Sequence, residues 1–464
     1  MEERKDSSPL GTIPVPKLML KMALPAVVAQ LVNLLYNIVD RIYIGHIEGV
    51  GADALTGIGL CVPLILLVNA FAMLGAAGGA PRAAIALGQG NHKEAERIMS
   101  NCFTMLLIIA LLLMTVFEIW AEPLFWFFGA SENTIRYSLQ YLRIYALGTV
   151  FTLTVLGMNS FLTAQGYSYF AMITTLIGAI INIALDPLFI FTFRMGVRGA
   201  AIATVVSQAV SCLWVLWFLI LGKKTLLRLR RLRLEPSVCG PCLGLGASGF
   251  VMLSTEAILN ICFNSSLSKF GGDVAVGSMT IISSCTNLVL LPTSGICQGC
   301  QPIVSYNFGA GNKERVKKCV ALEIAICGGY TFLFWGFCML FPQLLAKIFS
   351  NDTALVEYTS WTMRVYMAGI FAMGFQTSCQ QSFMALGQAK TSLLLACLRK
   401  LVLLIPLIYI LPAFSQNDVR AVFLAEPVSD IIAATVTVTV FVISFGRILK
   451  RGAVKIGETE KSVC

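Results

Sequence analysis

Long apolar stretches separated by short polar segments run through almost the whole chain. Each stretch has about 20 residues or more, the length that a helix needs to cross the roughly 30 Å hydrocarbon core of a bilayer. A helix also satisfies its own backbone hydrogen bonds in lipid. The predicted spans are residues 17–40, 55–80, 99–120, 135–163, 166–191, 198–221, 240–268, 274–300, 317–341, 355–385, 391–413 and 419–446. Twelve spans predict an all-α, multi-pass membrane protein with both termini on one side.

Composition supports this class, because 57% of the 464 residues are hydrophobic and only 12% are charged, about half the usual charged fraction of soluble domains. No cleavable signal precedes the first span, which we expect to target the chain itself. The fifteen cysteines lack metal-site or disulfide spacing, which indicates buried apolar residues in a reducing compartment. Cys239 and Cys242 form a lone CxxC, a weak signal for zinc or redox chemistry.

Lys and Arg are unequally divided between alternate connections, with 23 on one side and seven on the other. The seven are Arg41, Arg136, Arg194, Arg198, Lys269, Lys347 and Arg420. Since short cytoplasmic loops are enriched in basic residues, both termini are predicted to be cytoplasmic in a cell membrane. The net charge of +10 is therefore a topology signal. We expect the basic run at 223–233 to lie near anionic headgroups and not to bind nucleic acid.

The sequence repeats itself at an offset of 221 residues. Matched pairs include Pro81 with Pro302, Gly90 with Gly311, Tyr145 with Tyr366, and Gly166 with Gly387. We predict a cytoplasmic tail (1–16), a six-helix lobe (17–221), a basic cytoplasmic linker (222–239), a second six-helix lobe (240–446) and a second tail (447–464). Repeats of this kind commonly enclose a transport path, so we expect two bundles around a central cleft.

Ionisable and amide side chains inside the N-terminal spans indicate a working site. Asp186 follows Asn182 by one helical turn, and Asp40 shares a helical face with Asn33, with Tyr36 adjoining. Thr204 opens a polar stripe on the sixth span. A carboxylate in hydrocarbon is costly unless it is neutralised, so the two acids predict an ion-coupling site. The amides, taken singly, fit interhelical hydrogen bonding equally well.

The C-terminal half carries a different set of polar residues. The segment that matches Asp186-Pro187 contains Ile405-Pro406 instead, so the paired acids are absent there. Gln376 and Gln380 lie one turn apart on the tenth span. Glu256 on the seventh span remains open to three roles: a substrate-facing charge, a second ion site, or a structural partner.

Two further features of the spans concern charge balance and bending. We expect Glu426 and Asp430 to offset the buried Arg399 and Lys400 structurally. Pro25 interrupts the first span fifteen residues before Asp40, where it removes a backbone hydrogen bond and permits bending. It is either a hinge that responds to protonation or a tolerated membrane proline.

Three segments carry a resemblance to a known family: residues 181–189 (INIALDPLF), 196–204 (GVRGAAIAT) and 298–307 (QGCQPIVSYN). With these motifs the chain resembles, over about residues 15–450, the bacterial, DinF-like branch of the multidrug and toxic compound extrusion (MATE) family. The resemblance implies a cation-coupled antiporter that exports bulky cationic or aromatic compounds from a V-shaped cavity between two lobes. Proton-coupled members of this kind bend at a proline that matches Pro25.

The resemblance also assigns residues. Ion coupling falls to Asp40, Asn182, Asp186 and Thr204. Substrate binding is assigned to Tyr36, Asn33, Asn159, Glu256, Gln376 and Gln380. The coupling ion is H⁺, with Na⁺ at the same four N-terminal residues as the alternative, and no other cofactor is expected. Members with a C-lobe sodium site have an acid on the tenth span, which this chain lacks.

Two other functions compete with drug export. A lipid-linked saccharide or peptidoglycan-precursor flippase of the same superfamily would need a strongly basic cavity, but the spans carry few basic residues. A membrane-embedded enzyme is disfavoured because no phosphate loop, metalloprotease motif or paired-Asp motif occurs. We therefore expect a monomeric transporter that meets membrane lipid, small molecules and H⁺ or Na⁺, and no enzyme activity.

Overall fold

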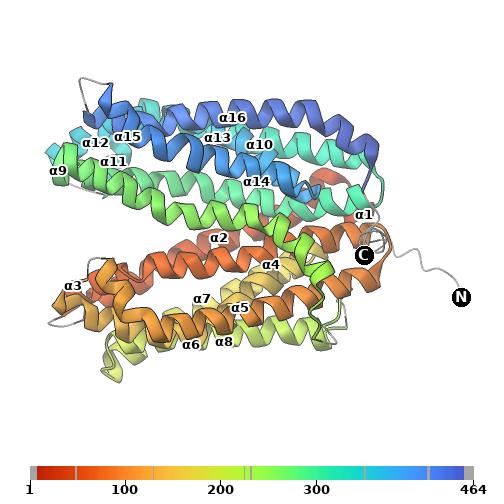
Figure 1. The fold of residues 1–464 in the computed structure, drawn as a ribbon, viewed down its shortest axis with the longest axis horizontal. Helices are drawn as coiled ribbons and strands as arrows, with labels where there is room; N and C mark the ends of the chain where they lie inside the picture. The colour runs from red at the N-terminus through yellow and green to blue at the C-terminus, as the bar shows by residue number, and fades with distance from the viewer. Residues whose placement is uncertain are drawn as a thin grey trace, which may run out of the picture. The chain divides into compact units, whose positions relative to one another are not determined.

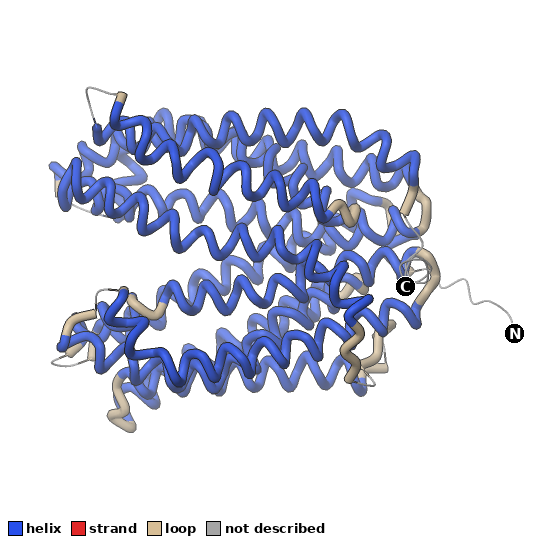
Figure 2. The backbone as a smooth tube through the Cα atoms, viewed as in Figure 1, coloured by secondary structure: helices blue, strands red, loops and turns tan. Residues whose placement is uncertain are grey.

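Every regular element of the structure is a helix. The computed structural model describes residues 8–47, 50–128, 130–223, 225–229, 232–349, 352–414 and 418–453, and those residues contain no strand (Figure 2). The helices are α1 (Pro9–Thr12), α2 (Val15–Gly45), α3 (Gly51–Gly59), α4 (Val62–Gly88), α5 (His92–Phe127), α6 (Glu132–Ala164), α7 (Ser168–Pro187), η1 (Leu188–Thr192), α8 (Val197–Leu221), α9 (Pro236–Gly309), α10 (Lys313–Leu340), α11 (Pro342–Phe349), α12 (Thr353–Tyr366), η2 (Met367–Gly369), α13 (Ile370–Ala385), α14 (Ala389–Cys397), η3 (Leu398–Leu404), α15 (Ile405–Ala413) and α16 (Asp418–Arg451) (Figure 1). The predicted all-α fold is confirmed.

Eleven helices among the described residues are long and apolar enough to cross a membrane. Two of them lie within α9, which turns at Gly272 (φ 64°, ψ −161°), a conformation that favours glycine. The predicted tenth span, 355–385, is not one continuous helix, because the 3₁₀ turn η2 separates α12 from α13. At that turn a Cβ on Gly369 would lie 2.8 Å from Cα of Pro427, so the backbones of η2 and α16 approach closely.

The helices group into two compact units. The N unit comprises residues 28–250, and the C unit comprises residues 8–27 and 251–453. These boundaries differ from the predicted lobes, since the start of α2 belongs with the C-terminal helices and the start of α9 with the N-terminal ones. Residues 8–13 were predicted as part of a tail, but they include the short helix α1. Directly after this helix, the carbonyl of Ile13 accepts a hydrogen bond from Arg315 at 2.7 Å.

Glycines allow close packing of the two segments that lie outside their predicted lobes, the start of α9 and the start of α2. In the N unit, a Cβ on Gly246 of α9 would lie 2.5 Å from the carbonyl oxygen of Leu74 in α4. In the C unit, a Cβ on Gly299 of α9 would lie 2.4 Å from Cα of Ala23 in α2. Both contacts require a residue without a side chain, as is common where membrane helices approach closely.

The 221-residue repeat is visible in the backbone. The start and the end of α6 recur at this offset as the start of α12 and the end of α13, and the start of α8 recurs as the start of α16. Two pairs of glycines also share positive φ angles: Gly90 (76°) with Gly311 (75°), and Gly166 (92°) with Gly387 (72°). The two halves therefore have the same local architecture, although the N-terminal acids have no counterpart in the second half.

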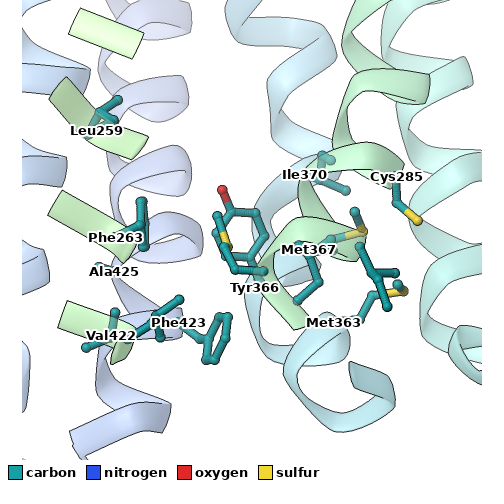
Figure 3. Packing of buried hydrophobic residues seen from close by; sticks show 14 of the residues in the cluster. Leu259, Phe263, Cys285, Met363, Tyr366, Met367, Ile370, Val422, Phe423 and Ala425 are labelled. Carbon is teal, nitrogen blue, oxygen red and sulfur yellow. The ribbon is translucent and has the colours of Figure 1, made fainter. Parts of the chain in front are cut away.

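Each unit is held by helix packing around its own core. In the N unit α6 packs against α4, α5 and α8, and α7 packs against α8. In the C unit α13 packs against α10 and α16. The ring of Tyr366 contacts the rings of Phe263 and Phe423 at centroid distances of 5.9 and 6.4 Å (Figure 3). Such edge-to-face contacts fix ring orientation in addition to burying area.

Candidate functional site

Asp186 is fully buried in the N unit, close to a few polar side chains. Asn182, one turn earlier on α7, donates from Nδ2 to Oδ1 of Asp186 at 3.3 Å and towards Oγ1 of Thr204 on α8 at 3.5 Å. The second oxygen of Asp186, Oδ2, has no hydrogen-bond partner among the described residues. An unpartnered oxygen in a dry interior is costly, so this position is suited to a bound proton or cation.

Asp40, on α2, interacts electrostatically with the same site. Its charge interacts with that of Asp186 and with the hydroxyl groups of Tyr36 and Tyr141. Oδ1 of Asp40 is buried and, like Oδ2 of Asp186, has no partner among the residues that the structure describes. Two carboxyl groups that repel each other in a low-dielectric site cannot both ionise cheaply. The four predicted ion-coupling residues are thus linked to one another. Hydrogen bonds join Asn182 to Asp186 and Thr204, and an electrostatic interaction joins Asp40 to Asp186.

The tyrosines of α6 were not predicted as site residues. Tyr141 and Tyr145 are buried and stacked, with ring centroids 6.1 Å apart, and Tyr141 also interacts with Thr204. Their spacing of four residues places both rings on one face of α6. That spacing, together with the match of Tyr145 to Tyr366 in the repeat, was the available signal in the sequence.

Two of the predicted substrate-binding amides, Asn159 and Gln380, form hydrogen bonds between helices. Asn159 is about 21 Å along α6 from Tyr145 and donates to the carbonyl of Ala171 at 3.1 Å. Gln380, its repeat counterpart, donates to the carbonyl of Ser392 at 2.7 Å, and both bonds join residues twelve apart. The repeat thus conserves an interhelical hydrogen bond at these positions. The side-chain oxygen of each amide, Oδ1 of Asn159 and Oε1 of Gln380, has no partner among the described residues.

The remaining predicted substrate residues divide between the units. Asn33 and Tyr36 are half-buried on α2, where the carbonyl of Asn33 accepts from Asn37 at 2.6 Å. Gln376 is buried on α13 of the C unit. Their assignment to substrate binding stays a prediction.

A network of five charged residues lies in the C unit. Arg399 donates from Nε to Asp430 at 2.9 Å and from a terminal nitrogen to Glu426 at 3.1 Å. Lys400 pairs with Glu256 and donates to the carbonyl of Met252 at 2.6 Å. Glu426 and Asp430 therefore offset Arg399 as predicted, while Glu256, whose side chain is 51% exposed, takes Lys400 as a structural partner.

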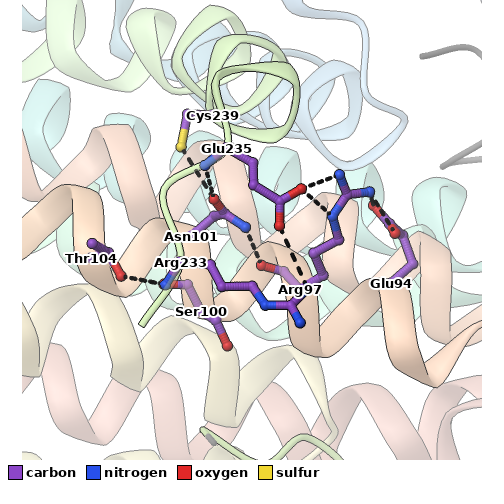
Figure 4. Close-up of polar contacts among 8 residues, drawn as sticks. All are labelled: Glu94, Arg97, Ser100, Asn101, Thr104, Arg233, Glu235 and Cys239. Atoms are coloured by element: carbon purple, nitrogen blue, oxygen red, sulfur yellow. Dashed lines mark hydrogen bonds and ion pairs between the residues drawn. The ribbon is translucent and has the colours of Figure 1, made fainter. Parts of the chain in front are cut away.

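A second polar junction connects α5 to the start of α9 within the N unit (Figure 4). Arg97 donates from Nε to Glu235 at 2.9 Å and also contacts Glu94 at 3.2 Å. The backbone N–H of Glu235 donates to Oδ1 of Asn101 at 2.5 Å. The hydrogen bond from Arg97, reinforced by the charges of Arg97 and Arg233, holds the pKa of Glu235 below its ordinary value.

This junction predicts an acid-sensitive contribution to stability. A carboxylate with a lowered pKa stabilises the fold above its unfolded-state pKa of about 4.3, and that contribution disappears as pH falls through the lower folded-state value. We expect Glu235→Gln to cost about 1 kcal/mol at neutral pH, measured by thermal unfolding in detergent. The midpoints of variant and parent should converge in acid. Glu314→Gln, at an exposed pair with Lys317, is the control and should change little at any pH; a Glu235→Gln deficit that persists in acid would contradict the assignment.

A profile of the MatE family matches residues 25–188 and 249–410, well over half of the chain. The chain belongs to the MatE family. The two matched segments correspond to the two copies of the internal repeat, so the MatE architecture accounts for both halves. Members of this family are transporters, and a multi-pass membrane transporter of small molecules agrees with the eleven apolar helices.

Individual MatE relatives are distant but match along most of their length. The multidrug export protein MepA of Staphylococcus haemolyticus is 23% identical, covering 85% of this chain and 86% of its own. An FAD transporter of Shewanella oneidensis is 25% identical, covering 92% and 94%. A solved structure of an outward-facing multidrug resistance MATE family transporter has a TM-score of 0.89 at 22% identity, covering 96% of this chain and 99% of that chain. The predicted family and fold are confirmed.

Proposed function

We propose that the protein is a proton-driven antiporter that exports bulky cationic or aromatic compounds, with the coupling proton bound at Asp186 and Asp40. The observation that carries this proposal is a pair of buried carboxyl oxygens in the N unit, one on each acid, that have no hydrogen-bond partner among the described residues. Asn182 and Thr204 position the Asp186 carboxyl. A proton satisfies a buried carboxylate oxygen without needing additional ligands.

The orientation of Asn182 favours a proton over sodium. A hard cation is bound by several oxygen ligands, whereas Asn182 presents its Nδ2 donor to both Asp186 and Thr204. An N–H directed at the site cannot coordinate a cation and disfavours positive charge nearby. Sodium binding would require this amide to turn over, so sodium is the weaker candidate.

Helix α2 offers a route from protonation to movement. Its first thirteen residues belong to the C unit, where Gly295 and Gly299 allow α9 to approach Val27 and Ala23. The remainder, with Asp40, belongs to the N unit, and Pro25 lies just before the change. Proline leaves one backbone carbonyl without its helical donor, which lowers the cost of bending there. We propose that protonation near Asp40 changes the bend at Pro25.

Charge favours a cationic substrate over an anionic one. The buried bases of the C unit, Arg399 and Lys400, are already paired with carboxylates. Three acidic residues against two bases leave the network without an excess of positive charge. Relatives that are named multidrug export proteins support export of drug-like compounds in general. Export of an aromatic dinucleotide is the second candidate, favoured by the FAD transporter among the relatives.

Transport by inside-out proteoliposomes tests the proposal. A pH gradient that is acidic inside is expected to drive accumulation of a fluorescent organic cation, and an imposed sodium gradient alone is expected not to. FAD is assayed in parallel under the same gradients. Accumulation driven only by sodium would refute proton coupling, and uptake of FAD without uptake of the cation would replace the proposed substrate class with the second candidate.

A further inference from the structure

Three arginines gather around one pocket at the start of α6 and α8 in the N unit. The pocket has a volume of about 570 Å³ and is lined by Arg136, Leu139, Gln140, Arg143, Ile144 and Arg198. The α6 residues recur at helical spacing, so they form one face that extends about 10 Å along the helix. Arg198 is the second residue of α8. The side chains of all three arginines are exposed.

No acidic residue of the described part of the chain forms an ion pair with any of these three arginines. The N-terminus of α8 adds further positive potential, because Gly196 at its N-cap supplies no side-chain acceptor to the first N–H groups. Three guanidinium groups beside a helix N-terminus create a local positive potential that attracts an anion. The pocket is therefore built for an anion.

The location of the pocket is unusual for basic residues. Arg136 and Arg198 are two of only seven basic residues in the connections on the predicted non-cytoplasmic side. Positive charge is generally scarce on that side of membrane proteins, so its concentration at one pocket calls for a local cause. Both residues lie near the beginning of membrane-crossing helices, at the expected depth of lipid headgroups.

We propose that this pocket binds the phosphate of an anionic phospholipid headgroup. Arg136, Arg143 and Arg198 hold the phosphate oxygens through charge-assisted hydrogen bonds, and Gln140 donates to the glycerol or headgroup oxygens. The half-exposed Leu139 and Ile144 contact the first carbons of the acyl chains. Free phosphate would satisfy the arginines but would leave these apolar side chains without a partner. The apolar part of the lining therefore favours a lipid.

Native mass spectrometry of the purified, delipidated protein tests this proposal. Phosphatidylglycerol, phosphatidylcholine and inorganic phosphate are titrated separately. We expect the first to bind about tenfold or more tightly than the second, since basic residues near a membrane surface attract anionic lipid. The triple variant Arg136→Gln/Arg143→Gln/Arg198→Gln should lose this preference.

The matched control is Lys269→Gln/Lys347→Gln/Arg420→Gln, which removes three exposed charges from the same predicted side and should keep the preference. Equal loss in both triple variants would mean general attraction by net charge and would overturn the site. Retention of the preference in the arginine triple variant, or binding of inorganic phosphate as tight as that of phosphatidylglycerol, would also overturn it. Should the triple variant fail to fold, Arg143→Gln alone is expected to lower the preference severalfold, and an unchanged preference there would be equally decisive.

Discussion

Asp186→Asn is expected to reduce gradient-driven export to the level of protein-free vesicles while leaving the protein folded. The amide keeps the volume of the carboxyl group and can still accept from Asn182, so helix packing between α7 and α8 should persist. It cannot take up and release a proton. Coupling depends on a difference in binding between two states, and a group that never changes protonation cannot supply that difference.

Three measurements separate this outcome from simple misfolding. Thermal unfolding in detergent should match the parent, and Asp53→Asn, the same substitution at an exposed position on α3, should transport normally. Drug affinity of the parent should fall as pH is lowered, because proton and drug binding are reciprocally linked if they compete. That dependence should flatten in Asp186→Asn. Full transport by a folded Asp186→Asn protein would remove the N unit as the coupling site.

The sequence was most informative where local spacing decides the structure. Asn182 and Asp186 are four residues apart on a helix, so their contact follows from helical geometry alone. The turn at Gly272 was predictable because it falls in the gap between two apolar stretches. The repeat was also visible in the sequence. Both copies need a positive φ at the same positions, so glycines recur there as matched pairs.

Contacts between distant segments were not predictable in this way. Glu256 and Lys400 are 144 residues apart, and nothing in their local patterns indicates that they pair. The change of unit inside α9 was missed for a similar reason. It depends on which glycines face a neighbouring helix, whereas the sequence shows only that small residues are present.

Arg399→Met is expected to give the largest loss of stability of any substitution in the C unit. Arg399 is the common partner of Glu426 and Asp430, and all three side chains are nearly buried, with 13, 12 and 4% exposure. Removing the guanidinium leaves two carboxyl groups facing each other in a dry interior. Breaking a buried ion pair in this way typically costs about 3–5 kcal/mol, because the remaining charge loses its compensation. Thermal unfolding in detergent should show this as a large drop in midpoint.

A rescue experiment identifies charge as the cause. The triple variant Arg399→Met/Glu426→Gln/Asp430→Asn changes the formal charge of the trio by only one unit and leaves no uncompensated carboxylate. It should therefore recover most of the lost stability. Arg364→Met, at an exposed arginine that donates to the carbonyl of Met339, is the control for losing a guanidinium and should cost much less. If the triple variant is no more stable than Arg399→Met, the loss reflects packing around η3 and not the buried carboxylates. Recovery of stability without recovery of transport would further separate the two roles, because it would show that the network contributes to export beyond holding α16 against η3.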